Sequence, residues 1–448
     1  MSNLSTRDLS VLWHPCTQMK EHEIYPLLPI VKGDGLYLID DQGNRYMDAV
    51  SSWWVNLFGH GRSEIKTAIQ QQADQLEQVI FAGCSNIPAI ELAEKLIQLT
   101  PKTLDRVFYA DCGSAAVEVA LKMSFQYWKN IGQPEKQRFI ALENGYHGET
   151  MGALSVGDVA LYKETYGPML FETIMAPSPD CYYREEGESW YDYSLRQSDK
   201  MAELLEQHHH EVAAVILEPL VQCAGNMRMY HPIYLTRVRQ LCDQYNVHLI
   251  FDEIAVGFGR TGTMFACEQA DVVPDFMCVS KGITGGFLPL AAVVTHDSIY
   301  QAFYDDYATL KGFLHSHSYT GNALACAAGV ATLDIFAKHN VLADNQILIN
   351  KLSQVAERFK QHPNVGDVRQ TGMILAIEMV KNKATKEAFD WRERRGIKVY
   401  QYALTQGALL RPLANVVYMM PPYVITEDEI ERLAEIAWQG INLAADAD

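Results

Sequence analysis

The chain has 448 residues, of which 48% are hydrophobic and 21% charged, a balance typical of a globular protein large enough for more than one domain. Its formal net charge of −18 argues against a nucleic-acid-binding surface, which needs clustered Lys and Arg. No apolar run approaches the ~18 residues of a membrane span, and the N-terminus lacks the apolar segment of a signal peptide. The nine scattered cysteines include no C-x-x-C pair, so neither a disulfide framework nor a metal site is indicated. We therefore expect a cytoplasmic protein without a nucleic-acid or membrane partner.

The first hundred residues begin irregularly and then become helical. Residues 1 to about 60 favour short strands, and the alternation in GLYLIDDQGNRYMDAV predicts a hairpin that turns at residues 41–44. Trp53 and Trp54 follow; paired tryptophans are mostly core or interface residues and less often line a substrate pocket. Helical spacing of apolar residues over 65–80, and a proline at position 88, predict two helices.

A phosphate site is one interpretation of the segment RVFYADCGSAAVEVALKMSFQYW. It predicts a strand, a tight turn and a helix, with Gly113 and Ser114 at the helix start. Free backbone N–H groups and the positive dipole end at a helix N-terminus suit a phosphate. A plain N-cap serine is the simpler interpretation. A strand predicted over 138–142 then leads to a loop N-G-Y-H-G, where Tyr146 by itself is an ordinary loop aromatic.

The middle of the chain alternates strands and helices. Residues 176–210 are polar and predict an irregular surface segment. The histidines at 208–210 favour a solvated helix end over a metal site, because consecutive residues do not share one helical face. A buried strand over 213–219, with Glu218 at its end, and a helix over 233–245 follow. The alternation over residues 100–295 implies an α/β fold with a mainly parallel sheet.

Residues 248–285 carry the clearest chemical signal. An apolar run over 249–251 ends at Asp252, and a second run over 276–279 ends just before Lys281. Open α/β sheets bind ligands at the carboxyl ends of strands, so an acid and an amine could face one ligand. Pyridoxal phosphate (PLP) needs such a pair: a lysine for its Schiff base and a carboxylate that keeps its ring nitrogen protonated. By spacing alone, a surface carboxylate and a surface lysine are an equal alternative.

The chain after residue 285 shows a different pattern of predicted helices and strands. A long helix is predicted to begin near Asn322. VGDVRQTGMILAIEMV then predicts two strands, and the segment after residue 407 predicts a β-rich unit followed by a final helix. This pattern favours a smaller C-terminal domain.

The stretches FDEIAVGFGRTG and PDFMCVSKGITGG together resemble the signature of the class III aminotransferases, which are fold-type I PLP enzymes. The resemblance implies a large domain over 63–328 with a mainly parallel seven-stranded sheet. It also implies a small α/β domain built from an N-terminal segment, 1–62, and a C-terminal part, 329–448.

The same resemblance assigns roles to the residues at the predicted site. Asp252 would pair with the PLP ring nitrogen, and Lys281 would hold the cofactor and shuttle a proton at the substrate carbon. Gly113 and Ser114 would bind the phosphate, and Tyr146 would stack on the ring. The loop before the helix at Asn322 would reach into the neighbouring subunit of a homodimer. There Ser318 would contact the PLP phosphate, with Ser316 and His317 beside it.

Within the class, the motifs W-H-P, S-S-W-W, N-G-Y-H-G and L-L-R-P are similar to those of members that act in biotin biosynthesis. The resemblance implies amination of 8-amino-7-oxononanoate to 7,8-diaminononanoate, with S-adenosylmethionine as the amino donor. Arg411 would clamp the substrate carboxylate, since arginine binds carboxylates in a fork, and Trp53 would line the apolar channel.

Two residues depart from this pattern. Cys16, a candidate residue of the catalytic site, stands where members that use S-adenosylmethionine commonly have tyrosine, and Ser316 stands where glycine is frequent. Lysine as the amino donor is therefore one alternative. Another is a class III ω-aminotransferase that acts on ornithine or 4-aminobutyrate. A non-enzymatic binding module is disfavoured, because Asp252 and Lys281 are both present.

Overall fold

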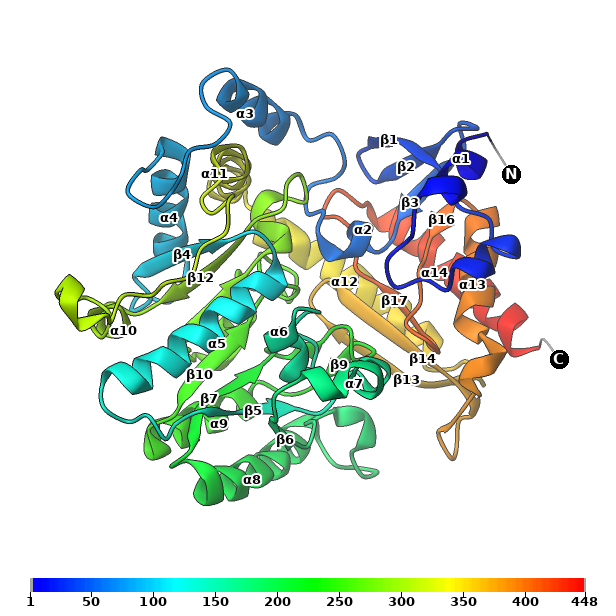
Figure 1. Ribbon diagram of the computed structural model, residues 1–448. Helices are drawn as coiled ribbons and strands as arrows, with labels where there is room; N and C mark the ends of the chain where they lie inside the picture. The colour runs from blue at the N-terminus through cyan, green and yellow to red at the C-terminus, as the bar shows by residue number, and fades with distance from the viewer. Residues whose placement is uncertain (1–2, 447–448) are drawn as a thin grey trace.

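The computed structural model describes residues 3–446, and its centre is a seven-stranded sheet (Figure 1). Six strands run parallel to one another, and β12 runs opposite to both of its neighbours. The predicted α/β fold with a mainly parallel sheet is thus confirmed. In spatial order the strands are β4 (Arg106–Ala110), β12 (Ala291–Thr295), β11 (Phe276–Val279), β10 (His248–Asp252), β7 (Val212–Leu217), β5 (Arg138–Leu142) and β6 (Ile174–Ala176).

Helices cover both faces of this sheet (Figure 1). Successive strand residues point to opposite faces: in β10, Leu249 and Phe251 pack with Leu235 of α9, whereas Ile250 packs with Ala116 of α5. Burial on both faces explains why these strands are continuous apolar runs. The helices around the sheet are α3 (Ser63–Ala73), α4 (Ile87–Leu99), α5 (Gly113–Asn130), α6 (Met151–Ser155), α7 (Ala160–Tyr166), α8 (Trp190–His208), α9 (Ile233–Tyr245), α10 (Asp297–Gln301) and α11 (Ala323–Lys338).

The two ends of the chain form the rest of the molecule. One four-stranded sheet has the order β1 (Ile30–Asp34), β2 (Tyr37–Asp40), β3 (Arg45–Asp48) and β16 (Ala408–Leu409), so the N- and C-terminal segments share it. The other contains β13 (Val365–Thr371), β14 (Ile374–Asn382), β15 (Glu387–Ala388) and β17 (Val416–Met419). The predicted domain boundaries, at residues 62 and 328, stay a prediction. The remaining elements are α1 (Asn3–Val11), α2 (Ser51–Trp54), β8 (Val221–Gln222), β9 (Arg228–Met229), α12 (Val341–Phe359), α13 (Arg395–Thr405) and α14 (Glu427–Ala445).

Most predicted elements are confirmed, and three predictions are wrong. Residues 190–208 form the helix α8 instead of irregular structure: Ser189 caps it by accepting a hydrogen bond from the Asp192 N–H, and Tyr193, Met201 and Leu205 are buried. The helix predicted over 65–80 ends at residue 73, since Ile65 is its one fully buried residue and supplies little packing for a longer helix. Residues 3–11 are helical rather than irregular.

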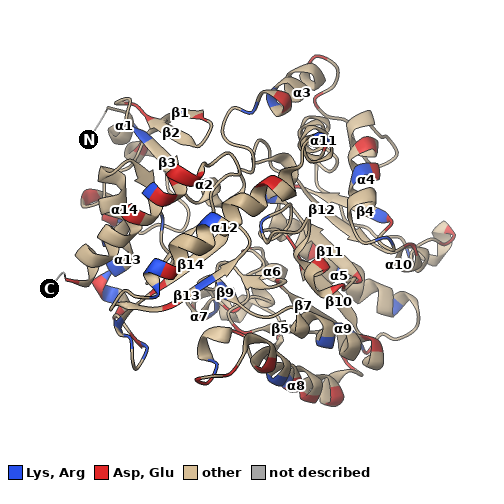
Figure 2. Ribbon diagram, turned by 180° about the vertical axis from the view of Figure 1, so that it is seen from behind, with Lys and Arg blue, Asp and Glu red and all other residues tan. Residues whose placement is uncertain are grey.

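Charges of both signs are mixed along the outer helices, as α8 and α12 show (Figure 2). Within residues 3–446, no helix is both long enough and apolar enough to span a bilayer.

Candidate active site

Asp252 and Lys281 meet at one edge of the central sheet. Asp252 is the last residue of β10, and Lys281 follows the end of β11 by two residues. The two strands are parallel neighbours, with Asp252 paired to Cys278, so their carboxyl ends lie side by side. Both side chains line one cavity of about 140 Å³. The cavity is lined by Trp54, Gly113, Ser114, Tyr146, His147, Gly148, Glu218, Asp252, Ile254, Ala255, Ser280 and Lys281.

The Asp252 carboxylate is buried and held in one orientation. Its Oδ2 lies 2.8 Å from Nδ1 of His147, and its Oδ1 accepts a hydrogen bond of 3.1 Å from the Ile254 N–H. The His147 side chain is fully buried, and no partner for its Nε2 is found in the described part of the chain. A fixed carboxylate at the cavity wall suits a cationic ring nitrogen.

The Lys281 ammonium is free of hydrogen bonds and ion pairs within residues 3–446. Its Nζ lies 4.6 Å from the centre of the Trp54 ring. Lys281 has a positive φ of 48°, a conformation that costs a non-glycine residue free energy and is found mainly at functional sites. Desolvation in the cavity lowers the pKa of Lys281. The amine is therefore available as a nucleophile or as a base.

The first turn of α5 faces the same cavity. The N-cap residue, Cys112, makes no side-chain capping hydrogen bond to the N–H groups of this turn. Gly148 closes over the turn with φ of 120°, and a Cβ there would lie 2.0 Å from Oγ of Ser114. The backbone at position 148 can therefore lie this close to Ser114 only because residue 148 is glycine and has no Cβ. Uncapped N–H groups beside a hydroxyl fit a phosphate.

Glu218 is a further cavity residue, to which the sequence pattern assigns no role. Its Oε1 accepts a hydrogen bond of 3.0 Å from the Tyr146 N–H, and its Oε2 accepts one of 3.0 Å from the Cys223 N–H. Burial raises the pKa of Glu218 to about 7. Glu218 directly follows β7, as Asp252 ends β10, so the strand-end rule could have found it. His147 lies in the N-G-Y-H-G loop, and only the fold shows that it contacts Asp252.

Cys16 lies one step away from this cavity. The Tyr146 hydroxyl donates a hydrogen bond of 3.0 Å to Oε1 of Glu149, and Sγ of Cys16 lies 3.6 Å from the same oxygen. Sγ of Cys16 is also 3.2 Å from the Tyr162 hydroxyl. Cys16, Glu149 and Tyr162 line a neighbouring cavity of about 630 Å³. Cys16 is thus linked to Tyr146, the predicted cofactor-stacking residue, through Glu149.

Trp53 and Trp54 occupy different places. Trp54 is buried and lines the cavity, whereas the Trp53 side chain is 47% exposed. The guanidinium carbon of Arg411 lies 5.1 Å from the centre of the Trp53 ring. The structure therefore brings the predicted channel residue and the predicted carboxylate clamp together.

The predicted residues 316–318 do not line the cavity of their own chain. Ser316 and Ser318 are exposed, and the Ser318 carbonyl accepts a hydrogen bond of 3.0 Å from Nε2 of Gln78. Nδ1 of His317 lies 2.9 Å from Oδ2 of Asp111. The loop is thus held at the surface.

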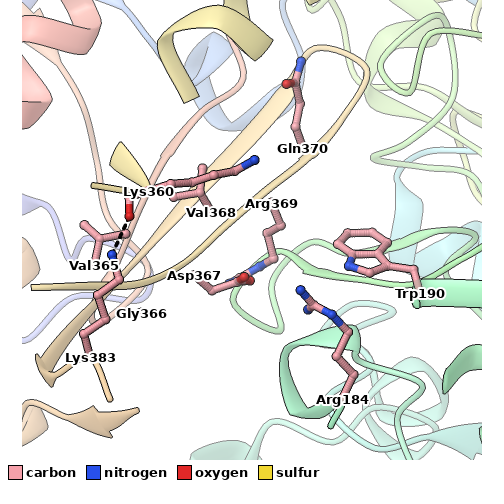
Figure 3. Close-up of a pocket in the computed structure, with 10 residues that line it drawn as sticks. All are labelled: Arg184, Trp190, Lys360, Val365, Gly366, Asp367, Val368, Arg369, Gln370 and Lys383. Atoms are coloured by element: carbon pink, nitrogen blue, oxygen red, sulfur yellow. Dashed lines mark hydrogen bonds and ion pairs between the residues drawn. The ribbon is translucent and has the colours of Figure 1, made fainter. Parts of the chain in front are cut away.

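A separate cavity of about 450 Å³ lies between α8 and β13 (Figure 3). Its lining is rich in basic residues, but Arg369 is paired with Asp367 at 3.2 Å and with Glu378 at 2.8 Å. Nζ of Lys383 donates a hydrogen bond to the Lys360 carbonyl. Because these cations already have partners, this cavity offers less for a ligand than the Asp252–Lys281 cavity does. Among residues 3–446 there is also no cluster of His, Cys, Asp and Glu that could hold a metal ion.

Comparisons with known proteins point to one family. The family model described as class-III aminotransferase matches residues 18–440. The adenosylmethionine-8-amino-7-oxononanoate aminotransferase of Helicobacter pylori is 48% identical over 437 residues, which cover 96% of this chain and 95% of that protein. The solved structure of the enzyme of the same name from Methanocaldococcus jannaschii is 42% identical, with a TM-score of 0.94 and 99% of both chains covered. An omega transaminase from Pseudomonas jessenii, solved in complex with PMP, is 28% identical, with a TM-score of 0.94 over 99% of this chain and 98% of that one.

Proposed function

Because the chain belongs to the class III aminotransferases, which use pyridoxal phosphate, we propose that it aminates 8-amino-7-oxononanoate to 7,8-diaminononanoate in biotin biosynthesis. We propose S-adenosylmethionine as the amino donor. Relatives that carry both molecules in their name are 42% to 48% identical to this chain over nearly its full length. The observation that supports the acceptor most directly is the contact between Arg411 and Trp53, a cation beside an exposed aromatic surface.

The cavity residues fit pyridoxal phosphate. The cofactor supplies an electron sink for the carbon that gains or loses the amine. Asp252 would face the ring nitrogen, and His147 keeps its carboxylate oriented. The N-terminal turn of α5 with Ser114 would hold the phosphate, and Tyr146 would lie against the ring. These roles rest on the geometry of the cavity and stay part of the proposal.

Lys281 would attach the cofactor and move the proton. Its amine has no competing hydrogen bond in the described chain, and the lowered pKa leaves more of it neutral at a given pH. A neutral Nζ could act as the base that holds and moves the proton at the substrate carbon. The Trp54 ring, 4.6 Å away, limits where the amine can move and excludes water on that side.

Arg411 would bind the acceptor by its carboxylate. The acceptor carries a carboxylate at one end of a long apolar chain, and a guanidinium forms two parallel hydrogen bonds to a carboxylate. The Trp53 ring would cover part of the apolar chain. This arrangement would leave the ketone end directed toward the cofactor.

We further propose a homodimer in which residues 316–318 of one subunit complete the site of the other. Large apolar side chains are exposed on the segments around this loop and near the N-terminus: Tyr307 is 94%, Leu314 91% and Trp13 88% exposed. Exposed apolar side chains of this size favour burial in an interface. The cytoplasmic location stays a prediction.

The donor comparison tests the proposed function. Purified protein with PLP is given 8-amino-7-oxononanoate and either S-adenosylmethionine or lysine, and the diamine is measured. Diamine formation with S-adenosylmethionine is expected. If diamine forms with lysine but not with S-adenosylmethionine, lysine is the amino donor. If the protein turns over ornithine or 4-aminobutyrate but not 8-amino-7-oxononanoate, it is an ω-aminotransferase and the proposed function is wrong.

A further inference from the structure

The segment that carries both site tryptophans has a left-handed backbone. The four residues of α2, from Ser51 to Trp54, have φ of 51°, 48°, 73° and 71°. This region is strained for a non-glycine residue, and four such residues in succession are rare. Interactions elsewhere must therefore hold the segment in place. We call it the left-handed turn.

The strongest anchor is Asp48, the last residue of β3. Its side chain is fully buried. Oδ1 accepts a hydrogen bond of 2.9 Å from the Ser52 N–H, and Oδ2 accepts one of 2.6 Å from the Ser52 hydroxyl. Oδ2 is also 3.0 Å from Nε2 of His60. One carboxylate thus fixes both the backbone and the side chain at the second residue of the left-handed turn.

The ends of the left-handed turn are fixed from the C-terminal part of the chain. The Ser51 hydroxyl donates a hydrogen bond of 2.7 Å to the Met420 carbonyl. Nε1 of Trp54 donates one of 3.0 Å to the Tyr418 hydroxyl. Within the turn, the Asp48 side chain forms its hydrogen bonds with Ser52, and neither of the two end bonds involves Asp48.

The left-handed turn presents two aromatic rings to two cations. Nζ of Lys281 lies over the Trp54 ring, and the guanidinium of Arg411 lies over the Trp53 ring. Arg411 follows β16, which pairs with β3 so that Asp48 lies opposite Leu409. The anchor and the arginine are therefore placed by the same pair of strands.

We propose that Asp48 is a positioning residue for the acceptor: by holding Ser52 in the left-handed conformation, it keeps the Trp53 ring against Arg411, where the carboxylate of the substrate binds. This inference rests on the proposed function. Asp48 does not line the Asp252–Lys281 cavity, so it acts through Trp53 and not on the cofactor.

Two serine variants separate this role from general stability. Glycine adopts a positive φ without strain, whereas alanine keeps the strain, and both lack the hydroxyl that bonds Asp48. Ser52→Ala is therefore expected to raise the acceptor KM more than Ser52→Gly does. Asp48→Asn is expected to raise the acceptor KM by about tenfold, the effect of losing one charge-assisted hydrogen bond. In all three variants the PLP affinity and the rate of the donor half-reaction should stay within about twofold of wild type, because Asp48 and Ser52 do not line the cavity and Trp54 keeps its own hydrogen bond to Tyr418.

Binding of nonanoate, a nine-carbon monocarboxylate, gives a readout independent of turnover. It is followed by tryptophan fluorescence of the holoenzyme. The inference is supported if Asp48→Asn and Ser52→Ala bind nonanoate more weakly than wild type and Ser52→Gly do. This result would stand even if the protein did not turn over 8-amino-7-oxononanoate, which would contradict the proposed function alone. Equal nonanoate affinity in all four proteins, absence of nonanoate binding by the wild type, or equal losses in the acceptor and donor half-reactions would overturn it.

Discussion

Nδ1 of His147 lies 2.8 Å from Oδ2 of Asp252, and both side chains are buried. The two residues are 105 positions apart: Asp252 ends β10, and His147 lies in the loop that follows β5. A buried carboxylate needs partners for its lone pairs, and the histidine supplies one while leaving the other face of the carboxylate toward the cavity. His147 thereby orients the carboxylate that we propose to face the ring nitrogen of the cofactor.

His147→Gln should weaken PLP binding. Loss of this buried partner frees the Asp252 carboxylate to rotate, at a cost of about 1–3 kcal/mol, which corresponds to roughly 5- to 150-fold in the dissociation constant. Absorbance titration of the cofactor-free protein with PLP measures the effect. His248→Gln is the matched control: His248 is also buried and bonds Ser124, but it lies at the opposite end of β10. Equal losses in the two variants would show that His147 has no specific role.

Lys281→Ala should abolish transamination while leaving some PLP bound without a covalent link. The proposed attachment point is the Lys281 amine, which lies 4.6 Å from the centre of the Trp54 ring. Borohydride reduction of the wild-type holoenzyme followed by peptide mass spectrometry locates the attached cofactor. Lys136 is an internal control, because its Nζ also lies 4.5 Å from a tryptophan ring but donates hydrogen bonds to backbone carbonyls. Label on Lys136, or undiminished turnover by Lys281→Ala, would refute the assignment.

Glu218 should make the folded protein less stable as the pH rises. Its pKa is about 7 in the fold, against 4.5 for an ordinary glutamate, so between these values the folded state binds more protons than the unfolded state. The free energy of unfolding therefore falls across this window, by on the order of 3 kcal/mol for this group.

Urea unfolding at several pH values, at one protein concentration, measures this slope. Glu218→Gln should reduce the slope between about pH 4.5 and 7 without removing it, because burial also raises the pKa of Glu253 to about 7. Since the variant also loses one acceptor for a backbone N–H, the slope is the readout and not the stability at one pH. A slope equal to that of wild type would contradict the prediction.

Arg411→Ala should raise the KM for 8-amino-7-oxononanoate by about 100-fold, because a two-point bond to the carboxylate is lost. The donor half-reaction should change little. Arg392→Ala is the matched control, since Arg392 lies 5.0 Å from the Trp391 ring in the same kind of contact at the surface. If the acceptor KM of Arg411→Ala equals that of Arg392→Ala, Arg411 is not the clamp.

The sequence by itself determined the central fold, and its resemblance to the class III aminotransferases led to the proposal of Asp252 and Lys281 as the two reactive groups. Continuous apolar runs such as 249–251 predict buried strands, because this signal is local. The strand-end charges at Asp252 and Lys281 are compatible with a ligand there, and the resemblance of their motifs to the class III aminotransferases is what assigns them to a cofactor. The prediction of irregular structure over 176–210 is wrong for 190–208, which form α8. This helix depends on the cap at Ser189 and on a few buried side chains that pack on α9.

Only the tertiary structure decided which residues surround those groups. The pairing of His147 with Asp252, the contact of Glu218 with the backbone of Tyr146, and the left-handed turn held by Asp48 join segments far apart in sequence or depend on backbone angles. No local pattern encodes such contacts, because the free energy that maintains them comes from burial and hydrogen bonding across the fold. Short sequence motifs therefore indicate the proposed reactive residues, Asp252 and Lys281, whereas the tertiary packing of the chain determines how their side chains are oriented.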